Sequence, residues 1–230
     1  MSTVPILFGR EASSIFLEAG MARSGGDRFK ALTRLRPRHF KPSPLSFKEP
    51  STGLTMGQHA EDTAKEWKIE QAQQDRIAYN SHINAAKATE DGRLKEEIEP
   101  LDCIHRDTIV RGDTTLERLA GLKPVFDRSS SGTITAGNSS PLTDGASSIL
   151  LASQDIVEKQ GLEVAAWIKD VEFAAIDPAD GLLMAPAVAV PRLLKRTGLS
   201  LDDMDIIEIH EAFGAQVACN LAAWEKGWKE

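Results

Sequence analysis

Hydrophobic positions recur at helical spacing in two neighbouring stretches of the first half of the chain. Residues 55–68 have apolar residues every three or four positions, which predicts a helix with one apolar face. Residues 70–89 predict a second helix, which we expect Gly92 to end because glycine readily adopts a left-handed conformation. A shorter helical turn is expected at 115–121. Four residues define the apolar face of the first helix: Met56, Ala60, Ala64 and Trp67.

The chain before these helices has a different character. Residues 1–36 favour helix, with a break expected at Gly25–Gly26. A run of prolines then predicts an extended connector, because proline cannot donate the backbone hydrogen bond of regular structure. These prolines are Pro37, Pro42, Pro44 and Pro50.

The pattern changes again at Gly132, where a segment rich in small polar residues and glycine begins. From there apolar helices and short apolar strands alternate, which predicts an α/β fold. Polar residues that follow a strand and precede a helix stand where open α/β sheets place their chemistry, and His210 has that position. The expected elements are helix Ala146–Ala152, strand Val164–Ile176, helix Ala187–Arg196, strand Asp205–Ile209 and helix Ala212–Trp224.

Composition excludes several classes of protein. The 230 residues are 41% hydrophobic and 27% charged, as in globular proteins rather than disordered chains. The longest nearly uncharged apolar run, 182–190, is too short to span a bilayer, and the first ten residues do not resemble a signal peptide. Two cysteines cannot form a disulfide framework. A cytoplasmic location is expected.

The net charge of −7 is unevenly distributed along the chain. Residues 1–48 have nine Lys and Arg against three acidic residues, a net +6, which leaves −13 for the rest. A basic arm of this kind suits a phosphate-bearing ligand, an acidic partner or a membrane surface, and it is equally consistent with a solvated helix face. Nucleic acid is not an expected partner, because no aromatic residues are interleaved with the basic ones.

The residues alone leave the candidate chemistry open. The five histidines lack metal-ligand spacing, so no metal site is predicted. Cys219 lies in an apolar helix and is expected to be buried, whereas Cys103 is in a polar loop. His210 is consistent with either a structural or a catalytic role. The segment 132–145 is consistent with either a tight connection or the approach of an extended ligand to the backbone.

The order of the motifs along the chain is more specific than any one of them. In that order they resemble the thiolase family of acyl-CoA acyltransferases, from about Thr52 to Trp224. Asp180–Pro186, and His rather than Asn in the last motif, resemble the thiolase subunit of fatty-acid β-oxidation complexes, as does Arg34–Arg38. The motifs are Met56–Glu61, Gln74–Arg76 with Ser81–His82, Arg111–Glu117, Leu122–Phe126, Gly132–Ser140, Asp144–Ala146 and His210–Phe213.

The resemblance implies a fold and a division into domains. Thiolases have two similar βα-layered halves, together an αβαβα arrangement, with a mostly helical loop domain that covers coenzyme A. Residues 1–141 would form the loop domain, 142–164 would close the first half, and 165–230 would begin the second. The strands Val164–Ile176 and Asp205–Ile209 would then belong to a sheet whose other strands lie outside this chain.

The resemblance also implies which residues meet coenzyme A, a substrate rather than a cofactor. Arg111 would lie against its nucleotide end, since guanidinium stacks on adenine and pairs with phosphate. Ser140 would contact the pantetheine arm, and three apolar residues would line the channel: Met56, Phe126 and Phe213. His210 would help to hold a water at an oxyanion hole.

The reaction of the family also needs a nucleophilic cysteine, a histidine base and a second cysteine. Their motifs are missing from these 230 residues, and neither Cys103 nor Cys219 takes their place. The chain is therefore expected to represent a fragment of a thiolase that is inactive alone. The alternative is a non-catalytic protein that binds coenzyme A or contacts a subunit. Expected partners are acyl-CoA, a second copy in the full-length protein, and a hydratase/dehydrogenase α subunit.

Overall fold

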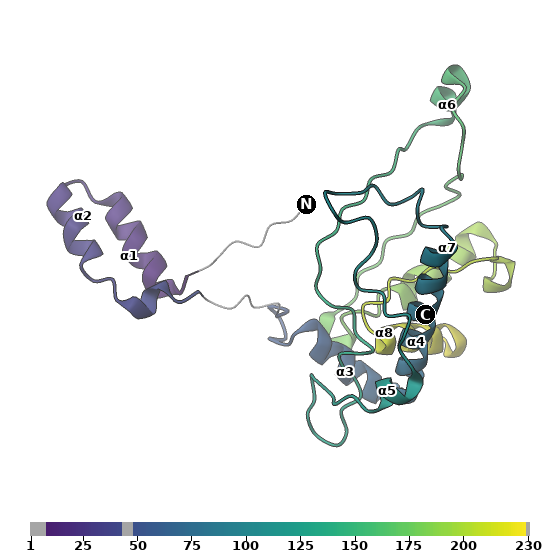
Figure 1. Ribbon diagram of the computed structural model, residues 1–230, viewed down its shortest axis with the longest axis horizontal. Coiled ribbons are helices and arrows are strands. Elements are labelled where there is room, and N and C mark those ends of the chain that lie inside the picture. Colours follow the sequence, from purple (N-terminus) through teal and green to yellow (C-terminus); the bar gives the residue numbers. More distant parts are fainter. Residues whose placement is uncertain (1–7, 43–47, 229–230) are drawn as a thin grey trace. The chain divides into compact units, whose positions relative to one another are not determined.

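The computed structural model describes residues 8–42 and 48–228. These residues separate into two compact units, one within Met1–Phe47 and one that contains most of the chain from Lys48 onward (Figure 1). Each unit has its own helices.

The N-terminal unit is a helical hairpin. Helix α1 (Arg10–Met21) packs against α2 (Gly25–Leu32), and a 3-10 helix, η1 (Pro37–Phe40), follows them. The expected break at Gly25–Gly26 is wrong by a few residues, because both glycines lie inside α2. The Ser24 side chain caps that helix by accepting a hydrogen bond from Asp27 N, which fixes its start.

The second unit begins with three helices at the predicted places. Helix α3 (Met56–Glu66) is followed by α4 (Gln71–Glu90) and by the single turn α5 (Leu116–Ala120). Thr55 and Gln58 form a capping box at the start of α3, in which each side chain accepts a hydrogen bond from the other residue's backbone. The backbone at Gly92 is left-handed just after α4, as the sequence predicts.

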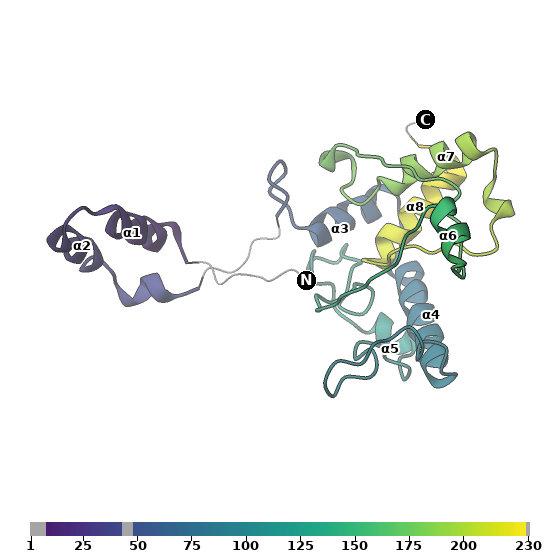
Figure 2. The same cartoon turned by 90° about the horizontal axis from the view of Figure 1, so that it is seen from above.

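The core of this unit forms around its last helix. Helix α8 (Gly214–Lys226) packs on α3, α4 and α7 (Pro186–Thr197), and Figures 1 and 2 show α8 beside α3 and α4. Both α7 and α8 confirm predicted helices. Small residues on α3 and α8 allow the helices to approach closely. The buried cluster contains Ala60, Ala64, Ile69, Ile134, Met184, Ala187, Phe213, Ala215, Cys219 and Ala223.

The helix expected at Ala146–Ala152 is wrong. These residues are in no regular element, and a helix begins only at α6 (Gln154–Gln160). The side chains of Ile149 and Leu150 are 78% and 87% exposed. The apolar side chains of this segment have no described surface on which to pack, so a helix here would gain nothing from burying them.

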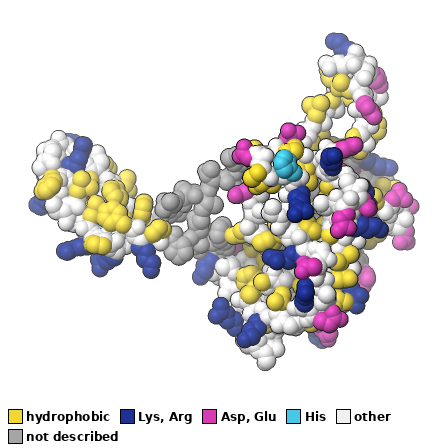
Figure 3. All heavy atoms as spheres, viewed as in Figure 1, with side chains coloured by type: hydrophobic (Ala, Val, Ile, Leu, Met, Phe, Trp, Pro, Cys, Tyr) yellow, Lys and Arg dark blue, Asp and Glu magenta, His cyan; other side chains and the backbone are white. Residues whose placement is uncertain are grey.

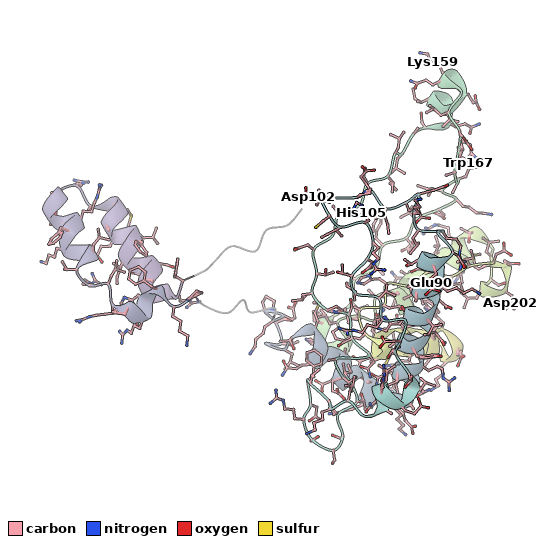
Figure 4. The ribbon with its side chains drawn as sticks, in the orientation of Figure 1. Glu90, Asp102, His105, Lys159, Trp167 and Asp202 are labelled. Atoms are coloured by element: carbon pink, nitrogen blue, oxygen red, sulfur yellow. The ribbon has the colours of Figure 1, made fainter. Side chains whose placement is uncertain are left out.

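The strands expected at Val164–Ile176 and Asp205–Ile209 are also absent from the described structure. Both segments lack a β-ladder, since no described segment pairs with them. Exposure nevertheless alternates from Val171 to Ile176, as it does along a strand. The described residues are therefore mostly helical, with two 3-10 turns, η2 (Pro178–Asp180) and η3 (Leu201–Asp203), beside α7. Figure 4 shows Trp167 on the first extended segment, away from the helices of the core.

Helices long and apolar enough to cross a membrane do not occur among the described residues. The same residues contain no cluster of three or more His, Cys, Asp or Glu that could bind a metal ion.

Candidate functional site

The glycine-rich loop 132–140 is anchored to α3 by a buried carboxylate. Glu61, only 2% exposed, accepts hydrogen bonds from Thr133 N at 2.7 Å, from Thr133 Oγ1 at 2.9 Å and from Ile134 N at 2.9 Å. Hydrogen bonds to an ionised acceptor are stronger than neutral ones. The start of the loop is thereby held in one conformation.

Helix α4 anchors the same loop through a second buried network. Asp75 accepts a hydrogen bond from Asn138 Nδ2 at 2.9 Å, and Asn138 Oδ1 accepts one from Thr135 N at 2.8 Å. The Gln74 side chain donates to Thr133 Oγ1 at 2.9 Å. All these polar groups except Thr133 are fully or almost fully buried, so the network fixes the loop against both helices.

The far end of the loop lies against the residues that open α8. Ser140 N donates to Ala212 O, and Gly214 N donates to Asn138 O, each at 2.9 Å. Ser139 and Phe213 form an antiparallel bridge between these two bonds. This pairing joins the loop to the segment that follows His210. Gly214 is required here, because a Cβ would lie 2.8 Å from the carbonyl oxygen of Gln74.

Two of the three expected channel residues meet beside this pairing. The rings of Phe126 and Phe213 are in edge contact, with centroids 5.8 Å apart and planes at 78°. Phe126 also covers Gly57, where a Cβ would lie 2.2 Å from its ring. Met56, the neighbour of Gly57 at the start of α3, is 43% exposed. The structure therefore brings Phe126 and Phe213 together, with Phe213 buried in the core, and Met56 adjoins the glycine that Phe126 covers.

A turn that precedes the loop is stabilised by charge. The Lys65 ammonium pairs with Asp127 and lowers the pKa of that carboxyl, to which hydrogen bonds from Ser129 also contribute. The same contact raises the pKa of Lys65. Because Phe126 adjoins Asp127, the ion pair holds the end of this turn close to α3.

Arg111 lies apart from the cluster, on the loop that follows α4. Its backbone N donates to His82 Nδ1 at 3.3 Å, and a Cβ on Gly112 would lie 2.8 Å from the Cβ of Ala86, so this stretch runs close along α4. The guanidinium is exposed, and it has no acidic partner among the described side chains. Figure 4 shows the same loop extending outward to Asp102 and His105.

The backbone pairing of Ser140 with Ala212 places Ser140 beside the segment that follows His210, and both Ser140 and His210 are exposed. Neither cysteine lies in this arrangement. Cys219 is fully buried as predicted, and burial, with the charge of Glu66, raises the pKa of its thiol to about 12. Cys103 is exposed on the outer loop.

The residues that hold the loop have no role predicted from the sequence. Glu61, Gln74 and Asp75 lie within the motifs Met56–Glu61 and Gln74–Arg76, but their function as anchors appears only in the structure. One signal was available: Glu61 directly follows Ala60 within the apolar pattern of α3, and a carboxylate at such a position needs buried donors.

Comparison with known proteins gives a consistent assignment. Residues 38–155 match the thiolase N-terminal domain, and residues 150–228 match the thiolase C-terminal domain. The chain is 40% identical to a 3-ketoacyl-CoA thiolase of Klebsiella pneumoniae over 229 residues, which cover 96% of this chain and 52% of the relative. A 3-ketoacyl-CoA thiolase of Photobacterium profundum is 41% identical over 226 residues, with the same coverage. The chain thus spans about half the length of these curated relatives.

Solved structures support the same fold. Human mitochondrial 3-ketoacyl-CoA thiolase in complex with CoA matches with a TM-score of 0.71 and 34% identity, over 78% of this chain and 46% of the human chain. Acetyl-CoA acetyltransferase of Bacillus anthracis matches with a TM-score of 0.72 and 34% identity, over 78% of this chain and 47% of the Bacillus chain. The match to these structures confirms the expected thiolase fold. The described residues do not form the layered sheets of that fold.

Proposed function

Because the chain belongs to the thiolase family, we propose that it forms the coenzyme A side of an acyl-CoA C-acyltransferase of fatty-acid β-oxidation. The reaction would cleave a 3-ketoacyl-CoA with coenzyme A, or run in reverse as a condensation. The 3-ketoacyl-CoA thiolases among its relatives, and the CoA complex of the human enzyme, support this choice.

One observation carries the proposal: the pairing of loop 132–140 with the segment that opens α8. It brings Ser140 next to the segment after His210 and places Phe213 against Phe126. Residues that are far apart in the sequence thus form one arrangement, held by buried hydrogen bonds to α3 and α4. Preorganisation of this kind lowers the entropic cost of binding an extended ligand.

Each residue then has a chemical task. The exposed Ser140 hydroxyl meets an amide of the pantetheine arm, and Met56 with Phe126 and Phe213 forms the apolar wall beside it. Arg111 binds the nucleotide end, because its unpaired guanidinium both stacks on adenine and pairs with phosphate. His210 holds a water that stabilises the oxyanion, which is a positioning role and not that of a base.

The covalent step needs groups from outside these 230 residues. A thiolate must accept the acyl group, and the high pKa of Cys219 together with its burial excludes that thiol. Cys103 is exposed on the outer loop and takes the place of neither family cysteine. We infer that the remaining segments of the thiolase fold supply the nucleophile and the base.

The exposed extended segments support this inference. Phe173 and Ile206 are 86% and 84% exposed, on the two segments that the sequence predicts as strands. Apolar surface and unpaired backbone of this kind favour association with further strands. In the complete enzyme these segments would join the layered sheets, and the enzyme would be a homodimer that can also bind a hydratase/dehydrogenase α subunit.

Titration calorimetry with coenzyme A tests the binding assignment. We expect weak binding, which Arg111→Ala should reduce by about tenfold, consistent with the loss of a charged contact. Arg106→Ala removes another exposed arginine from the same loop and serves as the matched control. Ser140→Ala should weaken binding by a smaller factor, because a neutral hydrogen bond contributes less.

Two results would contradict the assignment. The first is the absence of heat at about millimolar coenzyme A, which corresponds to a binding free energy weaker than about 4 kcal/mol. The second is equal loss of affinity in Arg111→Ala and Arg106→Ala, which would show a general effect of charge. Circular dichroism would show whether a variant that loses binding has also lost helicity.

A further inference from the structure

Three residues of α3 form a stripe along one side of the helix. Gly57, Glu61 and Lys65 follow one another at intervals of four positions, and residues at that spacing share a face. The stripe presents a glycine, a carboxylate and an ammonium in that order. All three residues contact the same segment of the chain, 124–135.

The segment 124–135 folds back on itself and is called here the 124–135 hairpin. Pro124 and Thr135 form an antiparallel bridge, and a backbone hydrogen bond of 2.9 Å joins the next pair of residues. The chain turns back between Asp127 and Gly132. Phe126 lies on the first arm of this hairpin, between the bridge and the turn.

The two arms of the hairpin are attached to α3 by different residues. Glu61 accepts hydrogen bonds from the backbone of Thr133 and Ile134, and so holds the second arm. Lys65 pairs with Asp127 at the end of the first arm. Glu61 is only 2% exposed, whereas the side chains of Lys65 and Asp127 are 35% and 26% exposed. The ion pair is therefore the outer of the two attachments.

The ring of Phe126 depends on both neighbours of this residue for its position. The ring covers Gly57, lies in edge contact with Phe213 and packs against the buried core. The backbone of Phe126 forms no hydrogen bond with another described residue. Val125 is fixed by its bond to the second arm, and Asp127 is fixed by Lys65. The ring is thus held from the two sides of the chain.

The carboxylate of Asp127 is oriented by its own turn. Its Oδ1 accepts a hydrogen bond from Ser129 N at 2.9 Å. Its Oδ2 accepts from Ser129 Oγ at 2.9 Å and from Ser131 Oγ at 3.1 Å, in addition to the contact with Lys65. Charged side chains of both signs are interspersed over the face of the second unit that Figure 3 shows. A specific pair, and not a field of one sign, therefore attaches the turn to α3.

We propose that Lys65 and Asp127 are positioning residues that set the ring of Phe126 in the wall beside the pantetheine arm of coenzyme A. The inference rests on the proposed function, in which Phe126 lines that wall. Both charged groups act through the ring and not by contact with the ligand. Loss of the pair would release the first arm of the hairpin while Glu61 still holds the second.

Other roles of the pair would affect ligand binding differently. If Lys65 bound a phosphate of the ligand directly, its loss would weaken every ligand that contains the nucleotide end. If the pair only stabilised the fold, its loss would affect all ligands equally. A positioning pair affects the part of the ligand that meets Phe126, which is the pantetheine arm.

Titration calorimetry with two ligands separates these roles. Coenzyme A contains both ends, whereas adenosine 3′,5′-bisphosphate has the nucleotide end without pantetheine. Lys65→Met and Asp127→Asn should each bind coenzyme A about fivefold more weakly, the effect of losing a partly exposed ion pair, and should bind the bisphosphate as the unaltered chain does. Lys65→Arg keeps the charge and should keep the affinity. Lys68→Met, which removes an exposed lysine just after α3, is the matched control and should change neither affinity.

A double-mutant cycle tests whether the pair acts through the ring. Phe126→Leu should itself weaken coenzyme A binding, and adding Lys65→Met to it should cause no further loss. Two losses that add, or an equal loss of affinity for coenzyme A and for the bisphosphate in Lys65→Met, would overturn the proposal. Unchanged coenzyme A binding in both Lys65→Met and Asp127→Asn would overturn it as well.

The position of the ring can also be measured without a ligand. In nuclear magnetic resonance spectra of the free chain, Lys65→Met should shift the signals of Phe126 and Gly57, and Lys68→Met should not. If the unaltered chain does not bind coenzyme A, the proposed function is wrong, and these signals alone decide whether the pair positions the ring. Unshifted signals in Lys65→Met would refute the positioning role. Circular dichroism verifies that each variant retains its helices.

Discussion

Replacement of Glu61 by alanine should release the loop that positions the proposed coenzyme A site. Glu61 is the only described side chain that binds both Thr133 N and Ile134 N, and it also accepts the Thr133 hydroxyl. Ile134 is fully buried and Glu61 is almost so. The substitution would therefore leave two backbone donors without an acceptor in a part of the core where water has little access.

The size of the expected loss in the free energy of unfolding follows from these three hydrogen bonds. A buried donor that loses its partner costs about 1–3 kcal/mol, so Glu61→Ala should lower the free energy of unfolding by about 3–5 kcal/mol. Glu61→Gln keeps the shape and one acceptor oxygen, and should cost roughly half as much. Both values exceed the change of about 0.5 kcal/mol or less that is typical of exposed substitutions.

Urea unfolding measured by circular dichroism tests the size of the effect, and hydrogen exchange measures the loop directly. We expect the amide protons of residues 133 and 134 to exchange faster in Glu61→Ala. Asp62→Ala is the matched control, since Asp62 is the exposed neighbour on the same helix. If Glu61→Ala and Asp62→Ala unfold at the same urea concentration with equal loop exchange, then Glu61 does not anchor the loop.

Three further perturbations test other parts of the account. Gly57→Ala should destabilise the chain by about 1–3 kcal/mol and change the near-ultraviolet circular dichroism, because a Cβ would overlap the ring of Phe126. The lowered pKa of Asp127 means that its ion pair contributes stability above the ordinary carboxyl pKa of 3.8 and loses it as pH falls toward the folded-state value. Asp127→Asn should therefore remove part of the acid sensitivity of unfolding below about pH 4. Cys219, with a pKa of about 12, should react with a disulfide reagent at pH 8 far more slowly than the exposed Cys103, since roughly one thiol in 10⁴ is ionised there.

The helices could be predicted from the sequence because their signals are local. Apolar spacing and the capping pair Thr55–Gln58 define α3, and Gly198 ends α7 in a left-handed conformation. The end of α4 at Glu90 and the turn at Gly92 follow from the same kind of signal. Each of these features depends on residues within one or two turns of the helix.

The strands could not be predicted in the same way. An apolar segment such as Val164–Ile176 becomes a strand only when another segment satisfies its backbone donors and acceptors, and the described residues offer no such partner. The helix expected at Ala146–Ala152 failed for a related reason, because its apolar residues have no surface to cover. Both errors concern segments whose structure depends on distant parts of the fold.

The site was predictable only in part. The motif order indicated which residues belong together, and the structure brings Phe126, Phe213 and the Ser140 segment into one arrangement. The partners of the buried anchors were not predictable, because the contact between Glu61 and Thr133 joins residues 72 positions apart. The roles of Arg111, Ser140 and His210 toward coenzyme A stay predictions.

Thiolysis of a 3-ketoacyl-CoA by free coenzyme A tests the central claim most directly. That claim is that these 230 residues build the coenzyme A side of a thiolase and leave the covalent chemistry to the rest of the fold. The account predicts no loss of ketoacyl absorbance above the uncatalysed rate, since removal of a nucleophile costs several orders of magnitude. Turnover by the isolated chain that disappears in Cys103→Ser would contradict it and identify Cys103 as a nucleophile.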